Sequence, residues 1–423
     1  MDPKHTNFPK HFFWGGSTAA HQVEGGLHNQ WTVWELAHAK ESAQTAHRHY
    51  AQLPSWEDIK DQAEEPENYI SGGGVDHFNR YEEDFELASK LNLNAFRFTI
   101  EWSRLEPEEG KWDQKAIDHY KNYITEMRRQ KLEPFLTLWH WTVPMWFYEK
   151  GGFEKHENIR YFEAFVSKIR DELIDDVEYV ISLNEPNVDA TFGYLLGLHP
   201  PGNRSLFKFL RVYRNLVRAH KSAYQILKSH KPSLQIGVSM QLANIQAKRP
   251  HNYADQITTQ WMRYFWNWWF LIRIKRQQDF LGLNYYFSDY YTGIGVRKNP
   301  KVPLNDMGWY MEPEGIYPLL LRAWSRFKKP IYITENGLAD AHDQYRRWWI
   351  EETIIAMERA ISEGVDLRGY FHWSLLDNFE WQDGWWPKFG LIEVDRKNSM
   401  KRKPRPSALW YAKLLEKIQS TRK

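Results

Sequence analysis

Short runs rich in β-branched and aromatic residues recur along the chain, separated by longer polar segments with helically spaced apolar residues. Such runs predict buried strands. After the first interval their centres lie roughly 40 to 55 residues apart, the spacing of a strand followed by a helix and a decorated loop. We expect strands at His11–Gly16, Ala95–Ile100, Glu133–Leu138, Val177–Leu183, Leu234–Met240, Asp279–Tyr285, Pro330–Thr334 and Leu367–Trp373.

Eight such units predict an α/β fold, a (β/α)8 TIM barrel, in which residues 1–423 form a single domain. A doubly wound parallel sheet is the competing fold, but no glycine-rich phosphate-binding motif follows the first predicted strand. Apolar residues spaced by three and four predict helices at Tyr81–Leu91, Ile117–Met127 and Leu206–Leu227. We interpret the polar, glycine-ended segment Ala39–Gly74 as a long loop over the barrel mouth.

The composition excludes several classes of function. The formal net charge is only +2, so no strong basic field favours a nucleic-acid partner. The absence of cysteine excludes disulfides, thiolate catalysis and cysteine-ligated zinc. The polar start of the chain lacks a signal-peptide pattern, and no run of about 18 apolar residues predicts a membrane-spanning helix. We therefore expect a cytoplasmic protein that binds neither nucleic acid nor a membrane.

Two glutamates follow directly after apolar strands, at the end of the barrel where enzymes of this fold carry catalytic groups. Glu185 follows the fourth predicted strand, and Glu335 follows the seventh. A single glutamate in such a place is most simply an exposed side chain or part of a buried ion pair. Two of them, each beside an asparagine, instead favour a pair of catalytic carboxyl groups.

Four sequence motifs support this interpretation. They are Phe12–Gly25, Leu183–Pro186 (Leu-Asn-Glu-Pro), Ile333–Gly337 (Ile-Thr-Glu-Asn-Gly) and Trp373–Trp381. In this order they resemble the N-terminal signature, the acid/base motif, the nucleophile motif and the C-terminal signature of glycoside hydrolase family 1. This is the β-glucosidase and β-galactosidase family, and the resemblance extends over nearly the whole chain.

The resemblance implies a retaining β-glycosidase that needs no metal or other cofactor. Glu335 is then the nucleophile and Glu185 the general acid/base, with their carboxyl groups about 5–5.5 Å apart. Arg97 and Tyr286 match family residues beside the nucleophile, where they would favour its ionised form. Asn184, next to the acid, would hold the 2-hydroxyl of the sugar, an interaction that strengthens in the transition state.

The same resemblance places further residues around the sugar in the pocket. Glu380 would accept hydrogen bonds from free 4- and 6-hydroxyls and repel a phosphate, so we expect an unphosphorylated sugar. The full set of expected substrate-binding residues is Gln22, His140, Trp141, Asn184, Trp373, Glu380, Trp381 and Phe389.

One segment departs from the family. Few residues separate Phe270 from Asp279, where family members commonly have a few dozen more. The preceding helix, Trp261–Phe270, is apolar nearly all round and needs cover on more than one side. We expect either a homo-oligomer contact or a hydrophobic ligand here, with repacking of neighbouring helices as the equal alternative.

The expected substrate is a small carbohydrate: a β-linked glucoside, or a galactoside or fucoside, of a short oligosaccharide or an aryl or alkyl aglycone. Two alternatives stay open. One is transglycosylation, in which a sugar hydroxyl intercepts the covalent intermediate. The other is a catalytically silent carbohydrate-binding barrel.

Overall fold

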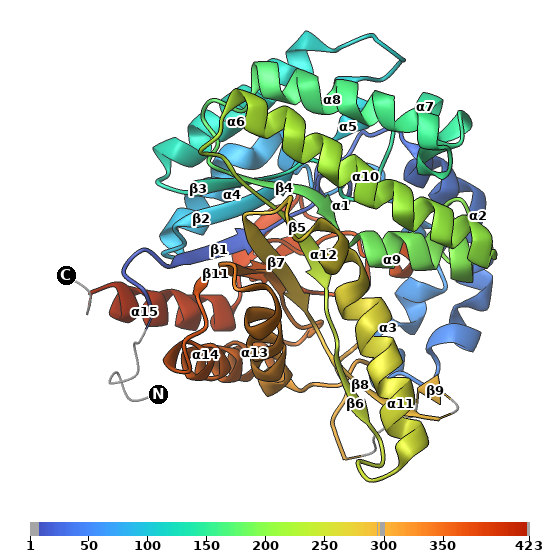
Figure 1. The fold of residues 1–423 in the computed structure, drawn as a ribbon, viewed down its shortest axis with the longest axis vertical. Coiled ribbons are helices and arrows are strands. Elements are labelled where there is room, and N and C mark those ends of the chain that lie inside the picture. The colour runs from blue at the N-terminus through green and yellow to red at the C-terminus, as the bar shows by residue number, and fades with distance from the viewer. Residues whose placement is uncertain (1–7, 294, 297–300, 421–423) are drawn as a thin grey trace.

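The chain folds around a closed barrel of eight parallel strands, in a computed structural model that describes residues 8–293, 295–296 and 301–420 (Figure 1). The order of strands around the barrel is β1-β11-β10-β7-β5-β4-β3-β2. Their bounds are β1 Phe13–Ser17, β2 Ala95–Thr99, β3 Glu133–Thr137, β4 Tyr179–Asn184, β5 Gln235–Gln241, β7 Phe280–Tyr285, β10 Ile331–Asn336 and β11 Leu367–Trp373. The predicted (β/α)8 barrel is therefore confirmed, and each strand agrees with its predicted range to within a few residues.

Helices surround the barrel on its outside (Figure 1). The three predicted helices are confirmed and extend slightly further than expected, as α4 His77–Lys90, α6 Gln114–Arg129 and α10 Leu206–His230. The other long outer helices are α8 Ile159–Glu172, α13 Ile316–Phe327, α14 Arg346–Ser362 and α15 Pro406–Ser420. Two small sheets were not predicted: β6 Asn244–Ala247 with β8 Ser288–Thr292 and β9 Gly295–Val296, and β12 Ile392–Asp395 with β13 Lys401–Pro404.

The barrel interior is divided into an apolar layer and a polar layer. The apolar layer is a buried cluster that includes Phe135, Tyr332 and Phe371. Successive side chains of a strand point to opposite faces, so residues two positions further along also point inward. Two positions after Phe135 and Tyr332 come Thr137 and Thr334, both polar and buried. The polar layer thus lies at the carboxyl ends of the strands, where the site is expected.

The interpretation of Ala39–Gly74 as a loop is wrong. The segment continues α2 (Gln30–Tyr50) and then forms α3 (Trp56–Ala63) and a short 3-10 turn at Pro66–Tyr69. Its buried stripe in α2 consists of Ala39, Ala43 and Ala46. Alanine is the best helix former, but its side chain is only weakly apolar. The segment therefore lacks the strongly apolar residues at helical spacing that would have predicted a helix. The position at the barrel mouth is correct, because Gln52 and Leu53 line the central cavity.

The apolar helical segment is α11 (Tyr253–Met262), a π-helical turn η5 (Arg263–Trp268) and α12 (Trp269–Ile274). Trp268, Trp269 and Phe270 are buried, and the Trp269 ring stacks on Tyr213 of α10 at 4.5 Å between centroids. Trp261 is 59% exposed and Phe265 is 44% exposed. Neighbouring helices therefore cover only one side of the segment, and aromatic surface remains on the other.

Within the described ranges, every helix is too short or too polar to cross a membrane.

A buried ion pair joins the C-terminal part of the chain to α4. The Arg402 guanidinium donates to both carboxylate oxygens of Asp84, at 2.8 and 2.9 Å, and to the carbonyl oxygen of Val75. Both charged side chains are almost fully buried. Removing one partner would leave the other charge buried and uncompensated.

We therefore expect Arg402→Ala to lower the free energy of unfolding by about 3–5 kcal/mol, measured by chemical denaturation. The matched control is Lys403→Ala at the next position, where an exposed lysine lies 3.6 Å from Glu393. An exposed pair of this kind contributes about 1 kcal/mol or less. Equal losses in the two variants would contradict the assignment.

Candidate active site

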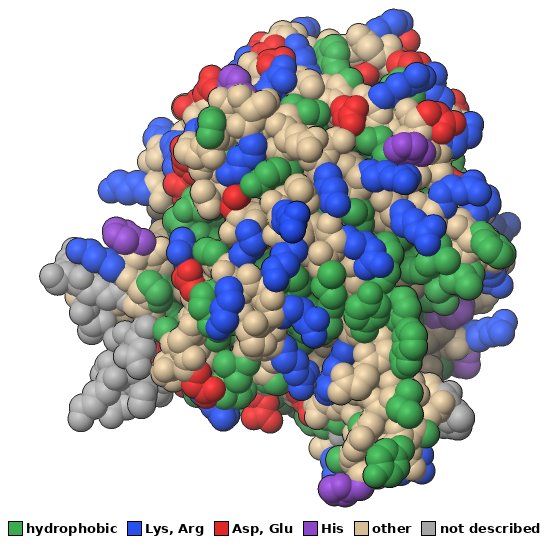
Figure 2. All heavy atoms as spheres, in the orientation of Figure 1, with side chains coloured by type: hydrophobic (Ala, Val, Ile, Leu, Met, Phe, Trp, Pro, Cys, Tyr) green, Lys and Arg blue, Asp and Glu red, His purple; other side chains and the backbone are tan. Residues whose placement is uncertain are grey.

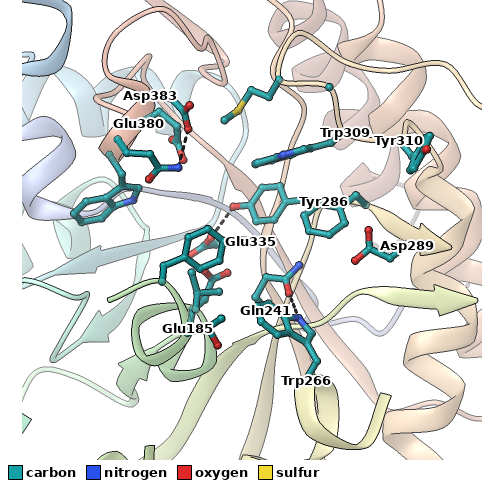
Figure 3. Close-up of a pocket in the computed structure, with 18 of the residues that line it drawn as sticks. Glu185, Gln241, Trp266, Tyr286, Asp289, Trp309, Tyr310, Glu335, Glu380 and Asp383 are labelled. Atoms are coloured by element: carbon teal, nitrogen blue, oxygen red, sulfur yellow. Dashed lines mark hydrogen bonds between the residues drawn. The ribbon is translucent and has the colours of Figure 1, made fainter. Parts of the chain in front are cut away.

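A cavity of about 860 Å³ opens at the carboxyl ends of the barrel strands (Figure 3). Most of the site residues predicted from the sequence line it: His140, Trp141, Glu185, Tyr286, Glu335, Trp373, Glu380, Trp381 and Phe389. The structure therefore brings together side chains from widely separated parts of the chain.

The three other predicted residues lie behind the cavity wall. Arg97 contacts Glu335, Asn184 contacts His140, and Gln22 contacts Glu380. Each is buried and hydrogen-bonded to a residue that lines the cavity. Direct contact of Gln22 and Asn184 with a sugar stays a prediction.

Glu335, near the end of β10, is held by two donors. Arg97 Nη1 donates to Oε1. The Tyr286 hydroxyl donates to Oε2 at 2.6 Å (Figure 3). Both contacts stabilise negative charge on the carboxylate and fix its orientation. A carboxyl group whose negative charge is stabilised by two donors and that faces a cavity is suited to nucleophilic attack.

Arg97 lies in the middle of β2. Its long side chain reaches up into the polar layer. There it donates to Thr137 Oγ1 at 3.1 Å and to Asn184 Oδ1 at 2.7 Å. The guanidinium is almost completely buried, so its charge is poorly screened by solvent.

Arg97 also determines the tautomer of His140 through Asn184. Because Asn184 Oδ1 accepts from Arg97, its Nδ2 is the donor to His140 Nε2, at 2.9 Å. Burial lowers the pKa of His140 well below its usual value, so the ring is neutral. Its proton must then lie on Nδ1, which has no partner in the described structure. His140 therefore offers one donor to a ligand.

Glu185 stands at the start of α9 (Pro186–Ala190) with a left-handed backbone, φ 44°. Its amide donates to the carbonyl of Ser239 at 2.8 Å, which fixes this turn at the end of β4. Burial, together with the negative charge of Glu335, raises the pKa of Glu185 well above its ordinary value. A carboxyl group that keeps its proton near neutral pH is suited to act as a general acid.

Asn284 is a site residue that the sequence reading missed. Its Nδ2 donates to Glu185 Oε1 at 2.8 Å and to Asn184 Oδ1 at 3.2 Å. Its Oδ1 accepts from the Thr334 hydroxyl at 2.6 Å, which fixes the orientation of the amide. The sequence feature that could have identified Asn284 is a polar residue within the apolar strand Asp279–Tyr285, two positions before Tyr286.

Glu380 lies at one end of the cavity. It accepts from Gln22 Nε2 at 3.3 Å and from Asn378 Nδ2 at 3.2 Å. Burial, and then the charge of Asp383, raises the pKa of Glu380 to about 8. The carboxyl group therefore largely keeps its proton at neutral pH, and it can both donate and accept hydrogen bonds.

Aromatic rings enclose this end of the cavity. The Trp381 ring lies 4.6 Å from that of Trp141 and is stacked on His21 at 5.3 Å. Tyr50 of α2 donates to Asp383 at 2.9 Å, so the unexpected helix supports the wall beside Glu380.

Known proteins resemble this chain in sequence and in architecture. The sequence profile of glycosyl hydrolase family 1 matches residues 4–273 and 271–420, in two parts that meet where the chain is short. The curated relative "Beta-glucosidase A" of Thermotoga maritima is 31% identical, over 97% of this chain and 98% of its own length.

Solved structures agree with the sequence comparison. A β-glycosidase from Pyrococcus horikoshii has a TM-score of 0.86 and 33% identity, covering 98% of this chain and 96% of its own. A β-glucosidase from Thermotoga maritima in complex with glucoimidazole has the same TM-score, 29% identity, and coverages of 98% and 99%. With this coverage by the family profile, by a relative and by solved structures, the chain belongs to glycosyl hydrolase family 1.

Proposed function

We propose that the protein is a retaining β-glycosidase that hydrolyses unphosphorylated β-glucosides, with Glu335 as nucleophile and Glu185 as general acid/base. This proposal rests on one observation: two carboxyl groups in the same cavity have different electrostatic surroundings. Arg97 and Tyr286 stabilise the charge of Glu335, whereas burial raises the pKa of Glu185.

In the first step, a Glu335 oxygen forms a bond to the anomeric carbon while the bond from that carbon to the leaving oxygen breaks. Glu185 gives its proton to the departing oxygen, which leaves as an alcohol. The negative charge of Glu335 disappears as the ester forms. This removes one cause of the raised pKa of Glu185, which is now ionised.

In the second step, Glu185 takes a proton from water, and the water oxygen attacks the anomeric carbon of the ester. The ester bond breaks, and Glu335 regains its charge between Arg97 and Tyr286. Two inversions at one carbon give a product with the original configuration.

Recognition of the sugar is proposed to rest on Gln22, His140, Asn184 and Glu380, with aromatic contacts from Trp141, Trp373, Trp381 and Phe389. The unpartnered Nδ1 of His140 and Oε1 of Gln22 support this arrangement, because a buried polar atom needs a partner. Lys and Arg are absent from the described residues that line the cavity, so a phosphate dianion would lack a counter-charge. This favours an unphosphorylated glucoside.

The two alternatives are less well supported. A silent carbohydrate-binding barrel would not need a buried acid with a raised pKa facing a carboxyl group held by Arg97 and Tyr286. Transglycosylation uses the same intermediate but requires that a sugar hydroxyl displace water. The expected cytoplasmic location, and an oligomer or hydrophobic ligand at Trp261–Phe270, also stay predictions.

Replacing the nucleophile tests the proposal directly. Glu335→Gln keeps the shape of the side chain but removes the attacking charge, so we expect hydrolysis of an aryl β-glucoside to fall roughly 10³-fold or more. The measurement is release of the phenol under saturating substrate. Glu393→Gln, at the surface, is the control for loss of one carboxylate. Equal rates in wild type and Glu335→Gln would refute the assignment of Glu335 as nucleophile.

Asn284 provides a test through the pH profile. Because Asn284 donates to Glu185, its loss in Asn284→Leu raises the pKa of Glu185 further. The decrease of kcat/KM at high pH, which follows deprotonation of the acid, should then begin at higher pH. We also expect kcat to fall about tenfold or more, since Glu185 is ionised after it gives up its proton and a hydrogen bond to a charged group contributes roughly 1.5–3 kcal/mol.

The control is Asn215→Leu, which removes a buried amide outside the cavity that donates to the carbonyl of Phe153 at 2.9 Å. If the high-pH limb stays in place in Asn284→Leu, Asn284 does not act on Glu185.

A further inference from the structure

A second cleft lies outside the catalytic cavity, between α11, η5 and α13. Its volume is about 700 Å³, within the range of small-molecule sites, roughly 300–1,000 Å³. The residues that line it come from separate helices and share no member with the lining of the catalytic cavity. They include Gln260, Arg263, Tyr264, Trp268, Arg322 and Arg326.

Three arginines line this cleft without an acidic partner. Arg263 Nε donates to the carbonyl oxygen of Ile245 at 2.7 Å, and the Arg326 guanidinium lies 5.5 Å from the centroid of the Trp268 ring. Neither contact brings a carboxylate to the arginine. Among the described residues, no aspartate or glutamate lines the cleft, and none forms an ion pair with Arg263, Arg322 or Arg326. The positive charge of the cleft is therefore not neutralised by this part of the chain.

The Arg322 guanidinium has the fewest contacts of the three. It is partly buried, and its enclosed Nη1 has no hydrogen-bond partner in the described structure. Burial lowers the pKa of Arg322, and burial together with the charge of Arg322 lowers the pKa of Arg263 to about 10. Like charges that are partly removed from water destabilise one another. An anion in the cleft would relieve this repulsion.

The charge extends beyond the cleft. Figure 2 shows Lys and Arg side chains gathered over and between α12 and α13, with few Asp or Glu side chains among them. The whole chain has a formal net charge of only +2, so this face holds an uneven share of the positive charge. A surface field of one sign raises the local concentration of anions.

Arginine side chains favour phosphate over other anions. A guanidinium group donates paired N–H groups that match two oxygens of a phosphate, and several of them can neutralise more than one negative charge. Gln260 and Tyr264 add neutral donors to the same cleft. We propose that the cleft binds a small anion with phosphate groups, held by Arg263, Arg322 and Arg326. This inference does not depend on the proposed glycosidase function.

The anion site adjoins a wall of the catalytic cavity. Met262 and Trp266, before and after Arg263 in sequence, line that cavity. Ile245, whose carbonyl oxygen accepts from Arg263, lines it as well. An anion bound to Arg263 and Arg322 joins η5 to α13 through the ligand. We therefore expect the bound anion to stabilise the folded protein.

The test is isothermal titration calorimetry with pyrophosphate as the probe, in a buffer free of phosphate and sulfate. Sodium chloride keeps the ionic strength constant. We expect saturable binding of one pyrophosphate per chain, and a higher Tm with pyrophosphate than with chloride at the same ionic strength. Succinate, a dianion without phosphate, should bind more weakly. Lack of saturable binding, or equal binding of succinate, would overturn the inference.

Arg322→Gln locates the binding. We expect it to weaken pyrophosphate binding about tenfold or more, as for loss of one hydrogen bond to a charged group. Without pyrophosphate, the variant should be at least as stable as wild type, because it removes a charge that has no protein partner. Unchanged binding would overturn the proposal. A clearly lower Tm of the ligand-free variant would show a structural role for Arg322 and would also contradict it.

A matched pair of exposed arginines provides the control. Arg326 lies over the Trp268 ring in the cleft, and Arg347 of α14 lies over the Trp410 ring outside it, 5.0 Å from the centroid. Arg326→Gln should weaken pyrophosphate binding, whereas Arg347→Gln should not. Equal effects of the two variants would mean that pyrophosphate responds only to the overall charge of the protein, and would overturn the assignment to this cleft.

Discussion

A buried ion pair between Arg97 and Glu335 sets the arrangement of the active site. The arginine comes from the middle of β2 and the glutamate from the end of β10, so the barrel must close before the two charges can meet. Arg97 then orients Asn184, and Asn184 fixes the tautomer of the neutral His140 ring. The charge that remains on Glu335 raises the proton affinity of Glu185. A single pair thus connects the proposed nucleophile, the proposed acid and part of the sugar site.

The sequence predicted the strands well because each is a short apolar run with a polar residue at its end, and parallel barrels place those ends together. Glu185 and Glu335 follow this rule, and so does Tyr286. Asn284 was not predicted because it lies inside a strand and not at its end. Its contact with Glu185 forms only when the barrel closes. Period-2 alternation alone does not identify which inward polar residues touch one another.

Other features depend on packing that no local pattern records. The helical nature of α2 beyond Ala39 rests on a stripe of small alanines, which carries little hydrophobic signal. The short segment after Phe270 left exposed aromatic surface and repacking of neighbouring helices as equal alternatives, and Trp261 and Phe265 are exposed.

The central claim is that Glu335 attacks the sugar directly, leaving no place for a water molecule in the first step. Proton NMR of the first sugar released from an aryl β-glucoside, recorded before mutarotation, tests it most directly. The account predicts that the β-anomer appears first and that the α-anomer grows in only with time. Initial release of the α-anomer would mean a single inversion by water, and would contradict the roles given to both carboxyl groups.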